Sequence, residues 1–306
     1  MKHRKHSALP SHMHGLSLVE VLVSLVIGLV VVGAVLVSYI ASGKTSAQQA
    51  AYAEMNENAQ LGLGLLSRDL LLAGYAQPTG LEMTAGPLPV PTGNFAKNYT
   101  ARPVYGCDKV FLAPSATGDV ACATTSGKPA IEIVYEADEW NTIKTSSGAP
   151  SDCLGTGLNS VPAIAYNRYY LLKGTSGRFE LHCASRQGAN GQPLVDNVED
   201  MKFWYGEAGP PSPGVVPTLE AAEKQRRVLR YVTAGNLIDL NFARVIAVKV
   251  CLVIRSSEAV LDMELYPDPS KPPKYLDCDS VEQTISDRFL RRAYFTTVTL
   301  RNKMAF

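Results

Sequence analysis

Glu20 is the carboxylate whose position most needs a chemical explanation. It stands in a run from Leu16 to Ile40 that carries no other charge and is long enough to cross a bilayer as a helix. An acidic side chain in the middle of such a span costs about 2.5 to 3.5 kcal/mol on insertion scales. Two interpretations stay open: an edge carboxylate relieved by snorkelling toward the interface, or a residue that pairs with a positive charge in the membrane.

The cysteines form the second group that could do chemistry. All six follow the apolar run and none forms a C-x-x-C pair, so their even number and wide spacing favour disulfides over zinc. Six cysteines allow 15 connectivities, and some free buried thiols remain an alternative. Pairing neighbours along the chain joins Cys107 to Cys122, Cys153 to Cys183 and Cys251 to Cys278.

Catalytic residues are sparse. His182 is the single histidine beyond residue 14, and beside Cys183 on a strand it is expected to be structural or exposed rather than a ligand. The chain lacks a G-x-S-x-G nucleophile motif. Two acidic runs, at 136–139 and 196–200, do not follow the calcium-loop pattern and are expected to be solvated loop faces. We therefore predict no enzyme, and no catalytic, metal-binding or cofactor-binding residue.

The apolar run predicts a membrane segment with a defined orientation. It is too long for the core of a signal peptide, and no A-x-A cleavage site follows it. Lys2, Arg4 and Lys5 precede it, which places the N-terminus in the cytoplasm and the rest outside, in a compartment where disulfides persist. Residues 16–306 carry a slight excess of acidic side chains, which argues against a nucleic-acid-binding surface.

A second helical segment continues the first. From residue 42 to about 75, apolar residues recur at steps of three or four and form one face that can pack on a domain. Gly62 and Gly64 weaken this helix by about 1 kcal/mol each relative to alanine, and Gly74 is the expected C-terminal stop. The predicted face is Met55, Ala59, Leu63, Leu66, Leu70 and Ala73.

The remainder of the chain predicts a β-rich head. Residues 76–130 are expected to be loops with short strands, and strand patterns begin at Ile131, Ala163, Arg178, Val198, Ala243 and Arg291. In the Ala243 segment, the residues on one face are Ile246, Val248, Val250, Leu252 and Ile254. In 203–205, alternation predicts that some of the three aromatic side chains are core. A Pro- and Gly-rich break near 206–217 is a possible boundary, and a short helix is expected from Thr218.

The N-terminus resembles that of a type IV prepilin. A basic leader, MKHRKHSALPSHMHG, ends in Gly15, and Glu20 is the fifth residue after it. In that family a membrane peptidase cuts after the glycine, the new first residue is methylated, and the acidic fifth residue supports filament assembly. The resemblance implies these roles for Gly15, Leu16 and Glu20, although Leu16 departs from the common phenylalanine. The new α-amino group of Leu16 could pair with Glu20 of the same or an adjoining subunit and offset its desolvation.

Further stretches resemble PilW-type minor pilins: NENAQLGLGLLSRDLLLAGYA, VEDMKFWYG, ARVIAVKVCLVIRS and RRAYFTTVTLRN. The expected fold is α+β, with a long N-terminal helix packed on an antiparallel β-sheet head, pilin-like, with an enlarged C-terminal region. The expected parts are a leader at 1–15, a membrane and filament-core helix at 16–40, an amphipathic continuation at 41–75 and a head at 76–306, with the sub-boundary near 206–217.

The resemblance implies a structural minor pilin that helps to prime pilus assembly at or near the tip, supporting twitching motility, adhesion or DNA uptake. The implied partners are the prepilin peptidase, other minor pilins, the major pilin, a tip adhesin and the inner-membrane assembly platform, with no specific nucleic acid. Before assembly the chain would cross the inner membrane once, with a periplasmic head, and later join the filament at the cell surface. Two alternatives stay open: a minor pseudopilin of a type II secretion system, and a membrane-anchored periplasmic enzyme or binding protein.

Overall fold

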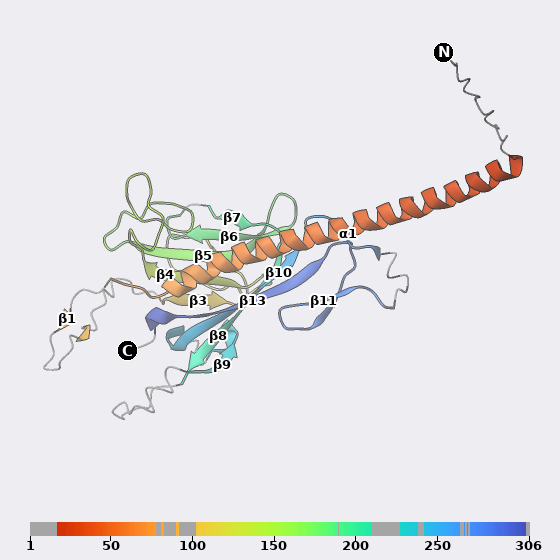
Figure 1. The fold of residues 1–306 in the computed structure, drawn as a ribbon. Helices are drawn as coiled ribbons and strands as arrows, with labels where there is room; N and C mark the ends of the chain where they lie inside the picture. The colour runs from red at the N-terminus through yellow and green to blue at the C-terminus, as the bar shows by residue number, and fades with distance from the viewer. Residues whose placement is uncertain are drawn as a thin grey trace, which may run out of the picture. The chain divides into compact units, whose positions relative to one another are not determined.

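The chain forms one long helix followed by antiparallel sheets (Figure 1). The computed structural model describes residues 17–77, 81–82, 90–91, 102–188, 190–209, 227–237, 242–263, 266, 268 and 270–303. Two compact units are distinguished, residues 1–50 and residues 51–306. Helix α1 is Leu18–Leu72, so it contributes residues to both units, and each unit is described by itself.

Between Leu18 and Ile40, the helix of the first unit is apolar on all sides apart from Glu20, Ser24 and Ser38. Every leucine, valine and isoleucine from Leu18 to Ile40 is at least 48% exposed. By length and composition, α1 is the one helix in the described part of the chain that could cross a membrane. An all-round apolar surface of this kind is stable in lipid or among other apolar helices, but not in water.

The second unit contains two larger antiparallel sheets. One has the strand order β3-β4-β5-β6-β7 and the other β13-β10-β8-β9, and two short pairs, β1-β2 and β11-β12, complete the set. The strands are β1 Leu81–Glu82, β2 Val90–Pro91, β3 Val104–Cys107, β4 Ala130–Glu136, β5 Ile164–Lys173, β6 Phe179–Ser185, β7 Gln192–Val195, β8 Val198–Ala208, β9 Val228–Val232, β10 Val245–Arg255, β11 Lys274–Leu276, β12 Glu282–Thr284 and β13 Arg291–Thr299. Short 3₁₀ turns lie at Ala234–Asn236, Phe242–Arg244 and Arg301–Lys303. The predicted α+β fold, with its long helix on antiparallel sheets, is confirmed.

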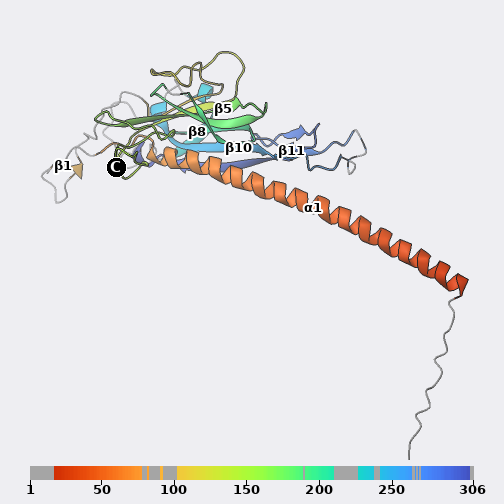
Figure 2. The same cartoon turned by 90° about the horizontal axis from the view of Figure 1, so that it is seen from above.

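The C-terminal part of α1, from Ala51, runs along the β-sheet region (Figure 2). It packs in one cluster with residues of both larger sheets, through the face that its periodicity predicts. Gly62 lies on this face, and a Cβ atom there would come within 2.8 Å of Leu252 Cδ1 on β10. The glycine that weakens the helix therefore permits its close approach to the sheet. Gly74, with φ +77°, follows the helix, and its N–H donates to Val134 O at 2.9 Å. The buried residues of α1 are Ala51, Met55, Ala59, Gly62, Leu66, Asp69 and Leu70, and Leu63 is partly buried.

Strand alternation supplies the rest of this core. Val248, Val250, Leu252 and Ile254 on β10 are fully buried in the main cluster. Ile246, expected on the same face, is buried outside that cluster, because the ladder to β8 shifts register between Val245 and Ala247. On β8, Phe203 and Tyr205 are core and Trp204 is partly exposed, as alternation predicts.

Disulfide-linked segments contact the outer face of each larger sheet. Phe111 and Val120 lie beyond β3, in the segment between the disulfide-bonded residues Cys107 and Cys122. They form a second cluster with Tyr170 of β5 and Ala184 of β6. Cys251–Cys278 similarly attaches the segment that carries β11 and β12 beside Val253 of β10. The third disulfide is Cys153–Cys183. All six cysteines are thus paired, in the neighbour-to-neighbour scheme considered above.

One expected element is wrong where the structure describes it. The helix expected from Thr218 should include residues 228–232, but these form β9, which pairs with β8 through Tyr205–Val232 and Gly206–Tyr231. The helical pattern was overridden by the free edge of β8, which offers backbone hydrogen bonds to an adjacent strand. Residues 210–226, with most of the expected break and the start of that helix, lie outside the described residues.

Candidate functional site

Glu20 lies in the first turn of α1, and its side chain is exposed. None of the described residues makes a hydrogen bond or ion pair with its carboxylate, while its backbone oxygen accepts from Ser24 Oγ at 2.7 Å. A helix N-terminus carries partial positive charge and favours a carboxylate in the first turn. Gly15 and Leu16, the predicted cleavage and methylation residues, lie outside the described residues.

Asp69, at the other end of α1, is the most deeply buried carboxylate that the helix supplies to the head. Its Oδ2 accepts from Tyr169 Oη and from Asn167 Nδ2, each at 2.6 Å, and its Oδ1 accepts from Tyr135 Oη at 3.4 Å. The Asn167 amide also donates to Tyr135 Oη at 3.2 Å. Helix α1 and strands β4 and β5 thus meet in one polar cluster inside the apolar core.

Burial determines the protonation behaviour of this cluster. Loss of water raises the pKa of Asp69, although the bonds from Tyr169 and Asn167 oppose the rise. Burial, and then the negative charge of Asp69, raises the pKa of Tyr169 and of Tyr135 well above the ordinary phenol value. The tyrosines therefore remain neutral donors, and the arrangement fastens the helix to the five-stranded sheet through satisfied hydrogen bonds.

A second buried charge holds the segment beyond β3. Arg168 is fully buried, and its Nε donates to Glu132 Oε1 at 2.7 Å. Its terminal nitrogens donate to three carbonyls of that segment: Pro114 O at 2.9 Å, Ala116 O at 2.5 Å and Gly118 O at 2.6 Å. A buried guanidinium with this many partners fixes the path of the segment over β5.

The sequence suggested that the acidic run at 136–139 is a solvated loop face. This prediction is wrong for Glu136 and Asp138. Glu136 is 7% exposed and accepts from Gln77 N, and Asp138 is 8% exposed and accepts from Tyr75 Oη. Both carboxylates instead satisfy donors of the segment that follows α1 and of the turn after β4. Glu139 is exposed and pairs with Lys144, in agreement with the expectation.

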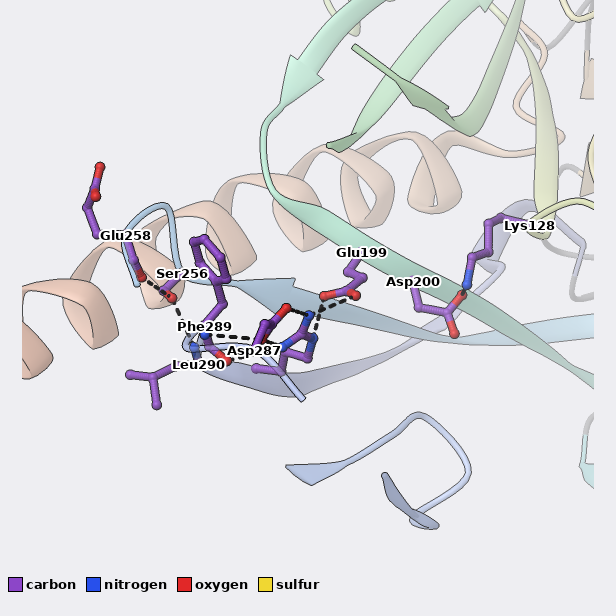
Figure 3. A network of polar contacts seen from close by, with 9 residues as sticks. Lys128, Glu199, Asp200, Ser256, Glu258, Asp287, Phe289 and Leu290 are labelled. Carbon is purple, nitrogen blue, oxygen red and sulfur yellow. Dashed lines mark hydrogen bonds and ion pairs between the residues drawn. The ribbon is translucent and has the colours of Figure 1, made fainter. Parts of the chain in front are cut away.

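Two residues of the second acidic run, Glu199 and Asp200, belong to the network of polar contacts drawn in Figure 3. Arg291 binds Asp287 with two nitrogens at 2.7 Å each, and its Nε donates to Glu199 at 2.6 Å. These hydrogen bonds raise the pKa of Arg291 and lower that of Asp287. Asp200 pairs with Lys128 at 3.0 Å, whereas Asp196 is exposed as expected.

His182 has a structural environment. The residue is 6% exposed, its Nε2 lies 3.1 Å from Glu180 Oε2, and its ring packs at a tilt on Tyr170. Of the two expected environments, structural or exposed, these contacts correspond to the structural one.

Sequence reasoning missed Asp69, although a signal for it was present. Stepping along α1 by four and three residues from Met55 reaches Ala59, Gly62, Leu66 and Asp69, and the next step reaches Ala73 just beyond the helix; all of these residues are buried. A carboxylate at a core position of an amphipathic helix predicts buried partners. Those partners lie on β4 and β5, and only the fold brings them together.

Two segments of the chain match models of known protein families. Residues 10–36 match the family model described as the prokaryotic N-terminal methylation motif, a range that includes Gly15, Leu16 and Glu20. Residues 168–302 match the model of type IV pilus-assembly protein W, PilW. A type IV-like pilin from Thermus thermophilus is similar in structure, with a TM-score of 0.37 and 11% identity, over 82% of this chain and 98% of that chain. No curated protein matches the sequence.

Proposed function

We propose that this chain, a PilW-type pilin with a class III prepilin signal, is a minor pilus subunit. In this proposal it primes the assembly of type IV pili and lies at or near the pilus tip. The methylation motif implies processing by a peptidase and assembly with other pilins. In the proposal these partners are other minor pilins, the major pilin beneath them, a tip adhesin and the inner-membrane assembly platform. The activities it would support are twitching motility, adhesion or DNA uptake.

The observation that carries the proposal is the exposed carboxylate of Glu20 on a helix that is otherwise uncharged as far as Ile40. Within a membrane or a filament core, that charge is costly unless a cation meets it. Cleavage after Gly15 would create such a cation at Leu16, and pairing with the same or an adjoining subunit would compensate both charges. The apolar side chains around Glu20 would then pack against neighbouring helices.

Membrane anchoring and the size of the head support the remaining parts of the proposal. The apolar helix and the pilin motif make the chain a membrane-anchored pilus component. Lys2, Arg4 and Lys5 favour a cytoplasmic N-terminus and a periplasmic head before assembly. The second compact unit, residues 51–306, is large for a repeating subunit and is more easily accommodated at a tip than in a shaft.

The intact mass of membrane-extracted protein tests the processing step. In a host with prepilin peptidase we expect loss of residues 1–15 and addition of one methyl group, and Gly15→Val should abolish both. Gly28→Val is the matched control, because Gly28 also lies in the N-terminal segment and has no atom within 4 Å of an added Cβ. An uncut wild-type chain would contradict the proposal and favour an anchored enzyme or receptor.

Glu20→Gln tests the assembly step separately from processing. The variant removes the charge and keeps the shape, so we expect cleavage to continue while the protein disappears from sheared filaments. Quantitative mass spectrometry of sheared wild-type filaments should find this chain scarce relative to the major subunit. Near-stoichiometric amounts would contradict a tip position, and a secretion defect with intact pili and twitching would point to a pseudopilus instead.

A further inference from the structure

A cavity of about 190 Å³ opens where the β5–β6 turn meets the ends of β8 and β10. We call it the arginine pocket. It is lined by Lys173, Gly177, Arg178, Phe179, Asn197, Glu199 and Arg255. Three of these side chains are cationic and one is acidic, so the lining carries an excess of positive charge.

The two guanidinium groups have no carboxylate partner. Among the described residues, neither Arg178 nor Arg255 makes an ion pair, and the side-chain hydrogen bond of Arg178 is a long one, 3.4 Å to Asn197 Oδ1. Both guanidinium carbons lie near the Phe289 ring, at 5.6 Å for Arg178 and 4.0 Å for Arg255. Arginine usually binds carboxylates or phosphates through two parallel N–H groups. The N–H groups of Arg178 and Arg255 have no such partner among the described residues.

The neighbouring acids are already engaged. Figure 3 shows Glu199 and Asp287 converging from different strands and loops, and both bind the Arg291 guanidinium. Asp200 lies beside them and pairs with Lys128. Glu199 is therefore the acidic group of the pocket lining, and its carboxylate is hydrogen-bonded to Arg291. Its charge also attracts Arg255, but neither Arg255 nor Arg178 makes a hydrogen bond or ion pair with a carboxylate of the described residues.

The backbone around the pocket is held in place. Asn197 adopts φ +59°, a left-handed conformation that asparagine tolerates better than most residues. Its backbone oxygen accepts from Arg255 N at 2.9 Å, so the turn that carries the amide is fastened to the end of β10. Two arginines kept close by a fixed frame repel each other, and burial together with Arg178 lowers the pKa of Arg255.

We propose that the arginine pocket is an oxyanion-binding site that takes a carboxylate or phosphate group against Arg178 and Arg255, with exposed Lys173 beside it. A bound oxyanion would satisfy the free N–H groups and remove the repulsion between the cations. This inference does not depend on the assembly role proposed above, because cleavage after Gly15 and the charge of Glu20 leave the pocket unchanged.

Thermal unfolding of the full chain in non-ionic detergent tests the site. The midpoint is followed while sodium chloride is replaced, at constant ionic strength, by sodium phosphate or by sodium succinate. An anion that binds the folded state raises the midpoint. We expect a rise for wild type and a response weakened at least about tenfold in apparent affinity by Arg178→Gln or Arg255→Gln, because charged hydrogen bonds are lost. A stronger response to succinate would assign the site to carboxylates, and a stronger response to phosphate would assign it to phosphoryl groups.

Arg292→Gln is the matched control, since Arg292 is exposed on β13 and does not line the pocket. It should respond to both anions as wild type does. Lys173→Gln provides an exposed pocket variant with little risk to folding, and it should weaken the response as well. The proposal is overturned if neither anion differs from chloride for wild type, or if the pocket variants respond as strongly as Arg292→Gln.

Discussion

Asp69 carries a carboxyl group at a core position of helix α1. Three side chains donate hydrogen bonds to this group and thereby compensate for the loss of its contact with water. Tyr169, Asn167 and Tyr135 reach it from two strands, so the cluster fixes both the rotation of α1 and its position along the sheet. An apolar residue at this position would pack but would leave those donors unsatisfied. The hydrogen-bonding chemistry therefore makes the contact specific rather than merely hydrophobic.

The first prediction concerns the stability conferred by Asp69. Asp69→Ala should destabilise the head, because each buried donor left unsatisfied costs about 1 to 3 kcal/mol. Urea unfolding of the full chain in detergent measures the loss. Ser67→Ala is the control, since Ser67 is only partly buried on the same helix and should change little. Equal midpoints for wild type and Asp69→Ala would contradict the role assigned to the cluster.

The second prediction concerns pH. Because the pKa of Asp69 is raised in the folded protein, the folded state binds more protons than the unfolded state between the ordinary carboxyl pKa and the raised value. The contribution of this group to the free energy of unfolding therefore increases as pH falls through that window. Urea unfolding at several pH values measures this effect. The free energy of unfolding of wild type, relative to that of Asp69→Asn, should increase as the pH is lowered.

Asp287 provides the opposite case for the same measurement. Its pKa is lowered by Arg291, so its contribution is present above the ordinary carboxyl pKa and is lost as pH falls. The difference between wild type and Asp287→Asn should shrink on acidification. The same pH slope for both pairs of proteins would contradict the assignment of the two carboxylates to opposite environments.

Among the secondary-structure elements, helix α1 contains two glycines whose surroundings differ. Gly62 faces Leu252, Leu181 and Val195 at close range, whereas Gly64 has no atom within 4 Å of an added Cβ. Both weaken the isolated helix equally. Only Gly62 is compensated by packing, because it lets the backbone of α1 approach β10.

The third prediction uses these two glycines as a matched pair. Gly62→Leu should lower the free energy of unfolding by about 1 to 3 kcal/mol, because a side chain cannot fit against Leu252 without moving the helix. Gly64→Leu should raise it by about 0.5 to 1 kcal/mol through helix propensity. Chemical denaturation of both variants measures the two effects, and effects of the same sign would show that Gly62 does not mark a close contact.

For the whole molecule, two of the three disulfides attach segments that lie outside the main hydrophobic cluster, whereas Cys183 of the third is buried within that cluster. Cys107–Cys122 and Cys251–Cys278 hold segments against the outer faces of the two larger sheets, and Cys153–Cys183 joins the loop before β5 to β6. The closed loops have sequence separations of 15, 27 and 30 residues. Loops of this length restrict the unfolded chain and thereby stabilise the folded one.

The fourth prediction follows from this arrangement. Replacing both cysteines of any one pair by serine should lower the free energy of unfolding by about 2 to 4 kcal/mol. A reductant should lower the unfolding midpoint of wild type and add nothing further in a variant that lacks all three pairs. A wild-type midpoint that is insensitive to reductant under conditions that reduce all six cysteines would contradict this stabilising role.

Features that depend on local pattern can be predicted from the amino-acid sequence alone. The buried face of α1 and the alternating strand β10 follow from repeats of 3.6 and 2 residues, which a chain displays without its fold. The apolar run follows from local composition, and the stop at Gly74 follows from the left-handed conformation that glycine readily adopts. The Gly15 to Glu20 spacing is equally local, and the match to the methylation motif covers it. Neighbour-to-neighbour disulfides could be named but not selected from 15 connectivities.

Long-range contacts, by contrast, determine which polar groups are buried and which partners they contact. Asp69 and Tyr169 are 100 positions apart along the chain, Arg291 and Glu199 are 92 apart, and residues 228–232 became a strand because the edge of β8 was free. Burial converted the acidic run at Glu136 and Asp138 from an expected solvent face into a set of hydrogen-bond acceptors. These pairs join residues that are far apart in the sequence, so no local pattern predicts them. The free energy of burying a charged group depends on the hydrogen-bond and ion-pair partners that the fold brings close to it.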